Sequence, residues 1–207
     1  MSETILIVDY GMGNVGSMVN MGRKAGGAMR VSNDPSEVAA ADKLILPGVG
    51  AFDAAIERLT QKGMIEALNH AVLERGVPVL GACLGVQLFT RRSEEGSLPG
   101  LGWIPADTVR FQCDRDGSEL RVPHMGWNRA EPAKEDPLLR GLPEESRFYF
   151  VHSYHLVCDD GADVLTWTTH GVRFASAVGR GNIWGTQFHP EKSHKFGLAL
   201  MRNFIAL

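Results

Sequence analysis

The sequence of 207 residues predicts an α/β fold, with a mostly parallel sheet flanked by helices and an added region of antiparallel sheet. Up to Phe89, short runs of aliphatic and β-branched residues alternate with segments that have helical spacing of apolar side chains. From Gly96 onward, turn residues become frequent and only short extended segments lie between them. Because no long linker separates the two halves, we expect a single domain over residues 1–207.

The first half contains four expected strands, each followed by an expected helix or turn. Gly26 and Gly27 end the first helix, and Asn33 to Pro35 have the pattern of a helix start. The strands are expected at Thr4–Asp9, Met29–Val31, Lys43–Leu46 and Val77–Leu80, and the helices at Gly16–Ala25, Pro35–Ala40, Ala51–Arg58 and Gly63–Glu74. In parallel sheets of this kind, functional sites lie beyond the carboxyl ends of the strands.

Three segments occupy such strand ends: Asp9–Asn14, Pro47–Gly50 and Cys83. The first is rich in glycine, but it lacks the complete G-x-G-x-x-G pattern of a dinucleotide-binding loop. Nucleotide binding at Asp9–Asn14 is therefore disfavoured.

The second half is expected to contain hairpins, edge strands and a final helix. The extended segments are Thr108–Phe111, Leu120–Val122, Phe148–Val151, Tyr154–Val157, Val164–Thr168, Phe174–Val178 and Asn182–Phe188. The closing helix, about His194 to Ala206, places Phe196, Leu200 and Phe204 on one face.

Composition and charge are those of an ordinary globular protein, with 44% hydrophobic and 22% charged residues and a net charge of −3. This charge does not indicate a nucleic-acid partner. Cys83, Cys113 and Cys158 have no paired spacing, which disfavours a disulfide framework and favours a reducing, cytoplasmic compartment. The first residues, Met1–Thr4, are not basic and no long apolar segment follows, so neither a signal peptide nor a membrane span is expected.

Cys83 lies between Gly81 and Gly85 at a predicted strand-to-helix turn. This is the spacing of a nucleophile elbow, with sulfur in place of oxygen. The glycines permit a sharp turn and close backbone packing, and the start of a helix favours a thiolate. We expect the thiol to be exposed at the mouth of a cleft. The alternative is an inert buried cysteine.

His189 and Glu191 supply the other two groups of a nucleophile triad. Pro190 biases His189 toward an extended backbone, in which the side chains at positions 189 and 191 lie on the same side. Glu191 is then placed to orient the imidazole, which acts as the base for Cys83. The alternative is a structural histidine at a strand end, followed by a carboxylate at a helix start.

Other histidines compete for the role of base. His124 and His152 lie in compact polar and aromatic motifs, whereas His70, His170 and His194 are expected to be solvated. No H-x-x-x-H or C-x-x-C spacing is present, so a metal site is not expected.

Together, Gly81–Gln87 and Gln187–Ser193 resemble the class I, triad-type glutamine amidotransferases. Within that class, the chain is similar to the glutaminase subunits of imidazole glycerol phosphate synthase over essentially its whole length. The segments that carry this closer resemblance are Asp9–Asn14, Leu46–Phe52, Pro123–Asn128 and Tyr149–Tyr154. The resemblance implies a flavodoxin-like fold and hydrolysis of L-glutamine to glutamate and ammonia without a cofactor.

The same resemblance implies roles for individual residues. Cys83 is the nucleophile, His189 the acid and base, and Glu191 the group that orients it. The oxyanion is stabilised by the backbone N–H of Leu84 and by the strand end at Gly48, Val49 and Gly50, which flips into place when a partner binds. The glutamine head group is bound by Gln87 and Glu95, with backbone around Ser153 and Tyr154. The residues implied at a partner interface are Asn14, Trp127, Asn128, Tyr149 and Lys192.

The implied partner is a (β/α)8-barrel cyclase subunit (HisF-like) in a heterodimer. Ammonia passes to it and joins a ribonucleotide intermediate of histidine biosynthesis, which yields imidazole glycerol phosphate and an aminoimidazole carboxamide ribonucleotide (AICAR). The segment Gln187–Gly197 also resembles paralogous subunits that supply ammonia for amidination of a surface-polysaccharide sugar. Histidine biosynthesis is the favoured interpretation and sugar amidination the alternative; the acceptor itself binds the other subunit.

Two further alternatives come from other functional classes. One is a different elbow-cysteine hydrolase or peptidase on a similar sheet, which would not need the Pro47–Gly50 segment. The other is a binding or scaffold subunit with an inactive site.

Overall fold

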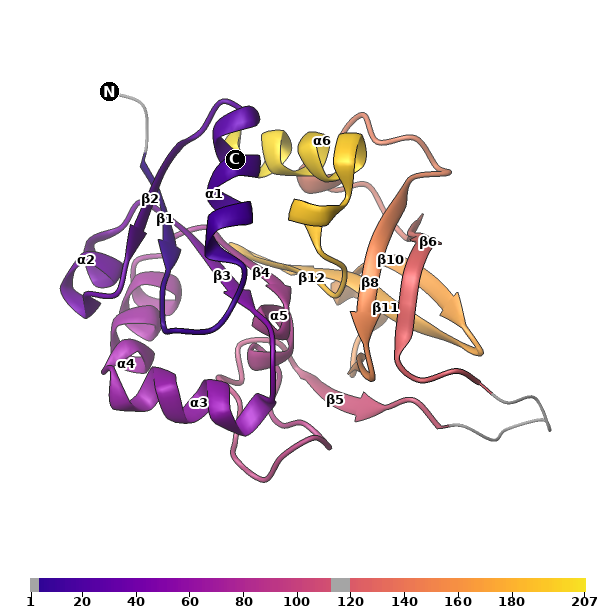
Figure 1. Ribbon diagram of the computed structural model, residues 1–207, viewed down its shortest axis with the longest axis horizontal. Helices are drawn as coiled ribbons and strands as arrows, with labels where there is room; N and C mark the ends of the chain where they lie inside the picture. Colours follow the sequence, from indigo (N-terminus) through magenta and orange to yellow (C-terminus); the bar gives the residue numbers. More distant parts are fainter. Residues whose placement is uncertain (1–3, 113–119) are drawn as a thin grey trace.

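The computed structural model describes residues 4–112 and 120–207. Among these residues, ten strands form one sheet, in the order β2-β1-β3-β4-β12-β11-β10-β7, with β9 on β11 and β5 on β9 (Figure 1). The parallel part consists of β2 (Ala28–Ser32), β1 (Thr4–Val8), β3 (Lys43–Gly48), β4 (Val79–Cys83) and β12 (Ile183–Thr186). The antiparallel part consists of β11 (Val172–Arg180), β10 (Val164–His170), β7 (Glu131–Pro132), β9 (Tyr154–Cys158) and β5 (Ala106–Arg110). The predicted fold class is confirmed.

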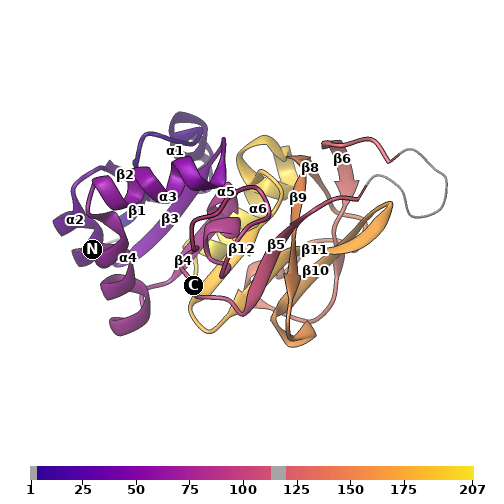
Figure 2. The ribbon, with the colours of Figure 1, turned by 90° about the horizontal axis from the view of Figure 1, so that it is seen from below.

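Helices cover both faces of the parallel strands (Figures 1 and 2). On one side lie α1 (Val15–Lys24) and α6 (His194–Ile205), and on the other lie α2 (Pro35–Ala40), α3 (Phe52–Gln61) and α4 (Met64–Asn69). Alternate residues of β1 point to the two faces, so Ile5 and Ile7 join one hydrophobic core and Leu6 and Val8 the other. No helix within residues 4–112 and 120–207 has the length and apolar character needed to cross a membrane.

A separate two-stranded antiparallel sheet is formed by β6 (His124–Arg129) and β8 (Arg147–His152), which stand side by side in Figure 1. Its inner face packs Phe148 and Phe150 into the core, whereas Met125 and Trp127 are exposed on its outer face. A single bridge between Tyr149 and His189 ties this sheet to the segment after β12. The sheet therefore joins an exposed surface to the carboxyl end of a central strand.

Three sequence expectations differ from the structure. The expected extended segment Leu120–Val122 is wrong, because these residues form a loop and bend before β6. The strand β6 itself was not expected, since Pro123, Gly126 and Asn128 resemble turn residues. The single helix expected over Gly63–Glu74 is α4 followed by a π-helical turn at His70–Glu74. Cys113 and the turn-type residues Asp116 and Gly117 lie outside the described residues.

Candidate active site

Cys83 ends β4 and immediately precedes the short helix α5 (Leu84–Leu88). Its backbone has φ 54° and ψ −111°, a conformation that non-glycine residues rarely adopt and that nucleophile elbows require. The flanking glycines are needed for close packing. A Cβ on Gly85 would lie 1.9 Å from the carbonyl oxygen of Leu46, and one on Gly81 would lie 2.6 Å from the Phe89 ring.

Cys83 lines a cleft of about 360 Å³, and only 7% of the residue is exposed. The expectation of an exposed thiol is therefore wrong, because Cys83 ends a central strand and is buried beside Gly48 of β3. The cleft is also lined by other residues of the Cys83–Gln87 segment and by residues from five other parts of the chain. They are Val49, Gly50, Leu84, Gln87, Glu95, Pro123, Val151, His152, Ser153, Tyr154 and His189.

His189 follows β12 and lies in the same cleft as Cys83. Its Nδ1 is 2.8 Å from Glu191 Oε1, and both side chains are almost completely buried. Burial opposes the charged imidazole, but interaction with Cys83 and Glu191 outweighs it and raises the pKa of His189 to about 9. The protonated imidazole is a neighbouring cation of the kind that favours thiolates.

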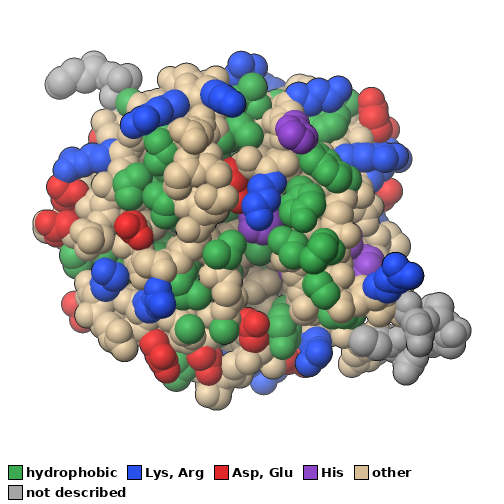
Figure 3. Space-filling model, in the orientation of Figure 1, with side chains coloured by type: hydrophobic (Ala, Val, Ile, Leu, Met, Phe, Trp, Pro, Cys, Tyr) green, Lys and Arg blue, Asp and Glu red, His purple; other side chains and the backbone are tan. Residues whose placement is uncertain are grey.

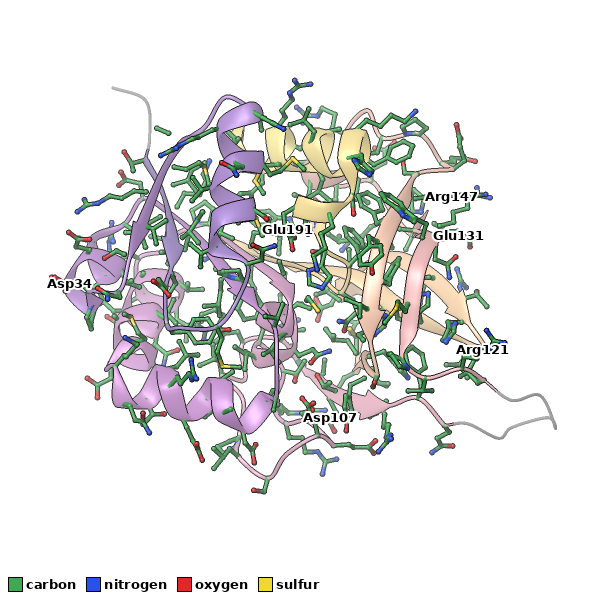
Figure 4. All side chains as sticks on the ribbon, in the orientation of Figure 1. Asp34, Asp107, Arg121, Glu131, Arg147 and Glu191 are labelled. Atoms are coloured by element: carbon green, nitrogen blue, oxygen red, sulfur yellow. The ribbon has the colours of Figure 1, made fainter. Side chains whose placement is uncertain are left out.

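Figure 4 shows Glu191 between α1 and α6, on the turn Pro190–Lys192. His189 Nε2 is buried without a hydrogen-bond partner of good geometry among the described residues, which leaves this nitrogen available for proton transfer. The cysteine, the histidine and the carboxylate thus have the connectivity of a nucleophile triad.

The segment Pro47–Gly50 approaches Cys83 from the neighbouring strand, since Gly48 pairs with Cys83 in the parallel register of β3 and β4. Gly48 has no room for a side chain, because a Cβ there would lie 2.9 Å from the backbone nitrogen of Gly85. The hydroxyl of buried Tyr10 donates to the carbonyl of Pro47 over 2.9 Å. Gly50 has φ +114°, which favours glycine, and Val49 is 42% exposed.

The predicted glutamine-binding residues Gln87, Glu95, Ser153 and Tyr154 all line the cleft. Gln87 Nε2 donates to the carbonyl of Tyr154 over 3.3 Å, and Glu95 Oε2 accepts from the backbone N–H of Phe52, at the start of α3, over 2.9 Å. Glu95 and Tyr154 both line this cleft, where a carboxylate and a backbone carbonyl are suited to a ligand ammonium group.

Gln187 is a site residue that the sequence interpretation did not identify. Its Oε1 accepts from Gln87 Nε2 over 3.1 Å, and its Nε2 lies 3.9 Å from Cys83 Sγ. Its position two residues before His189 could have identified it, because alternate residues of an extended segment lie on the same side.

The remaining histidines are not placed as bases for Cys83. His124 and His152 are buried and hydrogen-bonded to each other, and burial lowers their pKa values to about 4 and about 3. His170 was expected to be solvated, but it stacks on His124 with ring centroids 4.2 Å apart. His194 is exposed at the surface and stacks on Trp127.

Four of the predicted interface residues point to solvent. Trp127 is 45% exposed, Lys192 lies over the Tyr149 ring, and exposed Asn14 caps α1. Figure 3 shows hydrophobic side chains gathered around a lysine or arginine and a histidine on this face. Asn128 differs, because it alternates with Trp127 along β6 and its Nδ2 donates inward to the carbonyl of Thr169 over 2.9 Å.

Comparison with known proteins gives consistent results. Residues 6–207 match the family model "Glutamine amidotransferase class-I". The chain is 49% identical over 203 residues to imidazole glycerol phosphate synthase subunit HisH 2 of Pseudomonas aeruginosa, covering 98% of this chain and 99% of the relative. It is 50% identical over 201 residues to the subunit of the same name from Methanococcus maripaludis, covering 97% and 98%.

Solved structures share the fold at low sequence identity. PurLQS from Thermotoga maritima gives a TM-score of 0.71 at 17% identity, covering 100% of this chain and 98% of that one. A glutamine amidotransferase, also from Thermotoga maritima, gives 0.63 at 18% identity, covering 92% and 77%.

Proposed function

The chain belongs to the class I glutamine amidotransferases, and from this premise we propose that it is the glutaminase subunit of an imidazole glycerol phosphate synthase. In this role it hydrolyses L-glutamine and supplies ammonia to a (β/α)8-barrel cyclase of the HisF type, in the cytoplasm. The observation that supports it most strongly is the cleft shared by the strained Cys83 turn, His189 and Tyr154, with Glu191 hydrogen-bonded to His189 behind it.

The first half of the reaction forms a thioester. The Cys83 sulfur attacks the side-chain amide carbon of glutamine, and the carbonyl oxygen becomes an oxyanion. His189 gives its Nε2 proton to the leaving nitrogen, so the C–N bond breaks and ammonia departs. Glu191 holds the imidazole through the Nδ1–H hydrogen bond and stabilises its positive charge.

The second half releases glutamate. Neutral His189 takes a proton from water, and the resulting hydroxide attacks the thioester carbon. When the tetrahedral intermediate collapses, the C–S bond breaks and Cys83 returns as a thiolate beside the protonated histidine. Neither step needs a redox group or any electron donor, because only protons and acyl groups move.

The oxyanion needs two backbone donors, and we assign them to Leu84 N–H and to the Pro47–Gly50 segment. Leu84 directly follows the nucleophile and lines the cleft together with Val49 and Gly50. The glycines on either side of Val49 allow its peptide to rotate at low steric cost. Rotation of this peptide upon partner binding would couple glutamine hydrolysis to the assembled enzyme.

The surface proposed for the cyclase is the outer face of the β6–β8 sheet, which we define as the docking face. It consists of Met125 and Trp127 on β6 and Tyr149 and Val151 on β8, with Lys192 beside Tyr149. Met125 is 64% exposed and Trp127 is 45% exposed, which is typical of protein contacts when such side chains adjoin. Because Val151 also lines the cleft, this face adjoins the place where ammonia forms.

The proposal is tested by measuring glutamate formation with and without the barrel subunit encoded in the same genome. We expect slow hydrolysis by the chain alone and an increase of about 5- to 150-fold with the barrel subunit and its ribonucleotide, the usual range of coupling between sites. Imidazole glycerol phosphate should form at the same rate as glutamate. Stimulation only by a sugar-amidating enzyme, or cleavage of peptides without glutamine hydrolysis, would contradict the proposal.

A further inference from the structure

A continuous chain of hydrogen bonds runs from β6 to the wall of the glutamine cleft. Asn128 Nδ2 lies 3.2 Å from His124 Nε2, and His124 Nδ1 lies 3.0 Å from His152 Nε2. His152 Nδ1 lies 2.7 Å from the carbonyl oxygen of Tyr154. The same carbonyl accepts from Gln87, which is linked through Gln187 to the sulfur of Cys83.

The direction of each bond is fixed by the two ends of this chain. The Asn128 Oδ1 accepts from the Arg129 backbone N–H over 2.8 Å and its Nδ2 donates to Thr169, so Nδ2 is the atom that faces His124. An amide nitrogen can only donate and a carbonyl can only accept. His124 Nε2 must therefore accept, and His152 Nδ1 must donate to Tyr154.

Both imidazoles are consequently neutral and carry their hydrogen on Nδ1. A second hydrogen on His124 would point at the Asn128 amide, and one on His152 would point at the Nδ1–H of His124. Burial acts in the same direction, since it lowers the pKa values of both histidines. The other titratable groups packed here are His170, which stacks on His124, and His155, which contacts the shared neighbour Phe111.

His124 and His152 are directly opposite each other across the β6–β8 pair. They project from the inner face of the sheet whose outer face is the docking face. The partner-facing strand and the Tyr154 carbonyl are thus joined through side chains as well as through the backbone.

We propose that Asn128, His124 and His152 are positioning residues that fix the Tyr154 carbonyl for glutamine binding from the inner side of the docking strand. This inference rests on the proposed glutaminase function. None of the three residues reacts with glutamine. They act by holding a cleft-wall acceptor whose displacement weakens substrate binding, so their loss affects KM for glutamine more than kcat.

Two substitutions at His124 separate hydrogen bonding from packing. His124→Phe keeps an aromatic ring against Phe150 and His170 but removes both hydrogen bonds. His124→Asn loses the ring, yet places an amide nitrogen close to the position of Nδ1, where it can donate to His152. His155→Phe is the matched control, because His155 belongs to the same aromatic cluster and forms no link of the chain.

In the complex with the barrel subunit, we expect His124→Phe to raise KM for glutamine about tenfold, the effect of one buried polar group left without its partner. His124→Asn should stay within about threefold of the wild type, although its melting temperature should be the lower of the two. His155→Phe should leave KM unchanged, and ammonium-dependent turnover should be unchanged in all three variants. If only packing mattered, the KM for glutamine would rise as the melting temperature falls. His124→Asn would then have the higher KM of the two variants, and this result would overturn the positioning role.

The hydrogen positions are tested without any variant by long-range ¹H–¹⁵N spectra of the histidine side chains at neutral pH. Hydrogen on Nδ1 of both His124 and His152 is expected, and hydrogen on Nε2 of either would overturn the inference. Absence of glutamine turnover in the wild-type complex would refute the proposed function and the positioning role with it. Normal glutamine turnover by the wild-type complex, together with a higher KM for His124→Asn than for His124→Phe, would refute the positioning role alone.

Discussion

Lowering the pH from 7 to 5 should destabilise the fold through His124 and His152. Both are buried and neutral in the folded protein, with pKa values lowered from 6.5 to about 4 and about 3. In the unfolded chain they take up protons as the pH falls below 6.5. Between that value and about 4 the unfolded state therefore binds more protons than the folded state, so stability falls as the solution becomes more acidic.

The size of this effect follows from the two pKa shifts. At about 1.4 kcal/mol per pKa unit, each histidine costs roughly 2 kcal/mol at pH 5 relative to pH 7. His189 acts in the opposite sense, because its pKa is raised to about 9 and its stabilising contribution is lost only as the pH rises from 6.5 through 9. Between pH 7 and pH 5 that contribution grows by about 1 kcal/mol, so His124, His152 and His189 together lower the free energy of unfolding by about 3 kcal/mol.

Urea unfolding at a series of pH values measures this loss directly. The matched variant is His124→Phe, which removes one of the two histidines that are neutral in the fold. Its loss of unfolding free energy between pH 7 and pH 5 should be smaller than that of the wild type by about 2 kcal/mol. An unfolding free energy that stays constant to within about 1 kcal/mol over this range in the wild type would refute the claim that both histidines are held neutral.

Three other predictions concern the elbow, the triad and the docking face. Gly85→Ala should lower stability by about 1–3 kcal/mol in thermal unfolding, because its Cβ would lie 1.9 Å from a backbone oxygen, whereas Gly16→Ala on α1 has open space and should stabilise by about 0.5–1 kcal/mol. Equal effects of the two glycine substitutions would contradict the steric argument. Glu191→Gln should lower glutamine-dependent kcat by roughly 10²- to 10⁴-fold and leave ammonium-dependent turnover intact, because the carboxylate supports the charged imidazole of His189. An unchanged kcat would remove this residue from the triad. Trp127→Ala should weaken binding of the barrel subunit more than about tenfold in calorimetric titration with no loss of melting temperature, since the side chain is 45% exposed; unaltered affinity would place the interface elsewhere.

Much of the fold was predictable because the parallel half obeys local rules. Helix α2 begins at Pro35 behind a capping Asp34, as expected. The β6 strand was not predictable in the same way. Its inward residues are His124, Gly126 and Asn128, which are polar or small, so the usual alternation of apolar and polar residues is reversed. The tertiary environment, a buried aromatic and histidine cluster, makes those polar side chains core residues.

The candidate site also contains some residues that the sequence identifies and others that only the tertiary structure reveals. Sequence spacing and family resemblance together selected Cys83, His189 and Glu191, and the structure brings the first two into one cleft with the third behind them. Gln187 and the His124–His152 pair were not assigned roles, because their partners lie far away along the chain. Such contacts depend on the register in which the strands pair, and a shift of one residue would abolish them. No local sequence pattern indicates this register.

In the proposed function, glutamine is hydrolysed at Cys83 and the ammonia is used by a partner. The most direct test is Cys83→Ala in the assembled complex, assayed for product formation with glutamine and, separately, with ammonium salt. We expect glutamine-dependent turnover to disappear and ammonium-dependent turnover to persist at the wild-type rate, because the cyclase site lies on the other subunit. Retained turnover with glutamine, or loss of turnover with both nitrogen sources in a complex that still assembles, would contradict it.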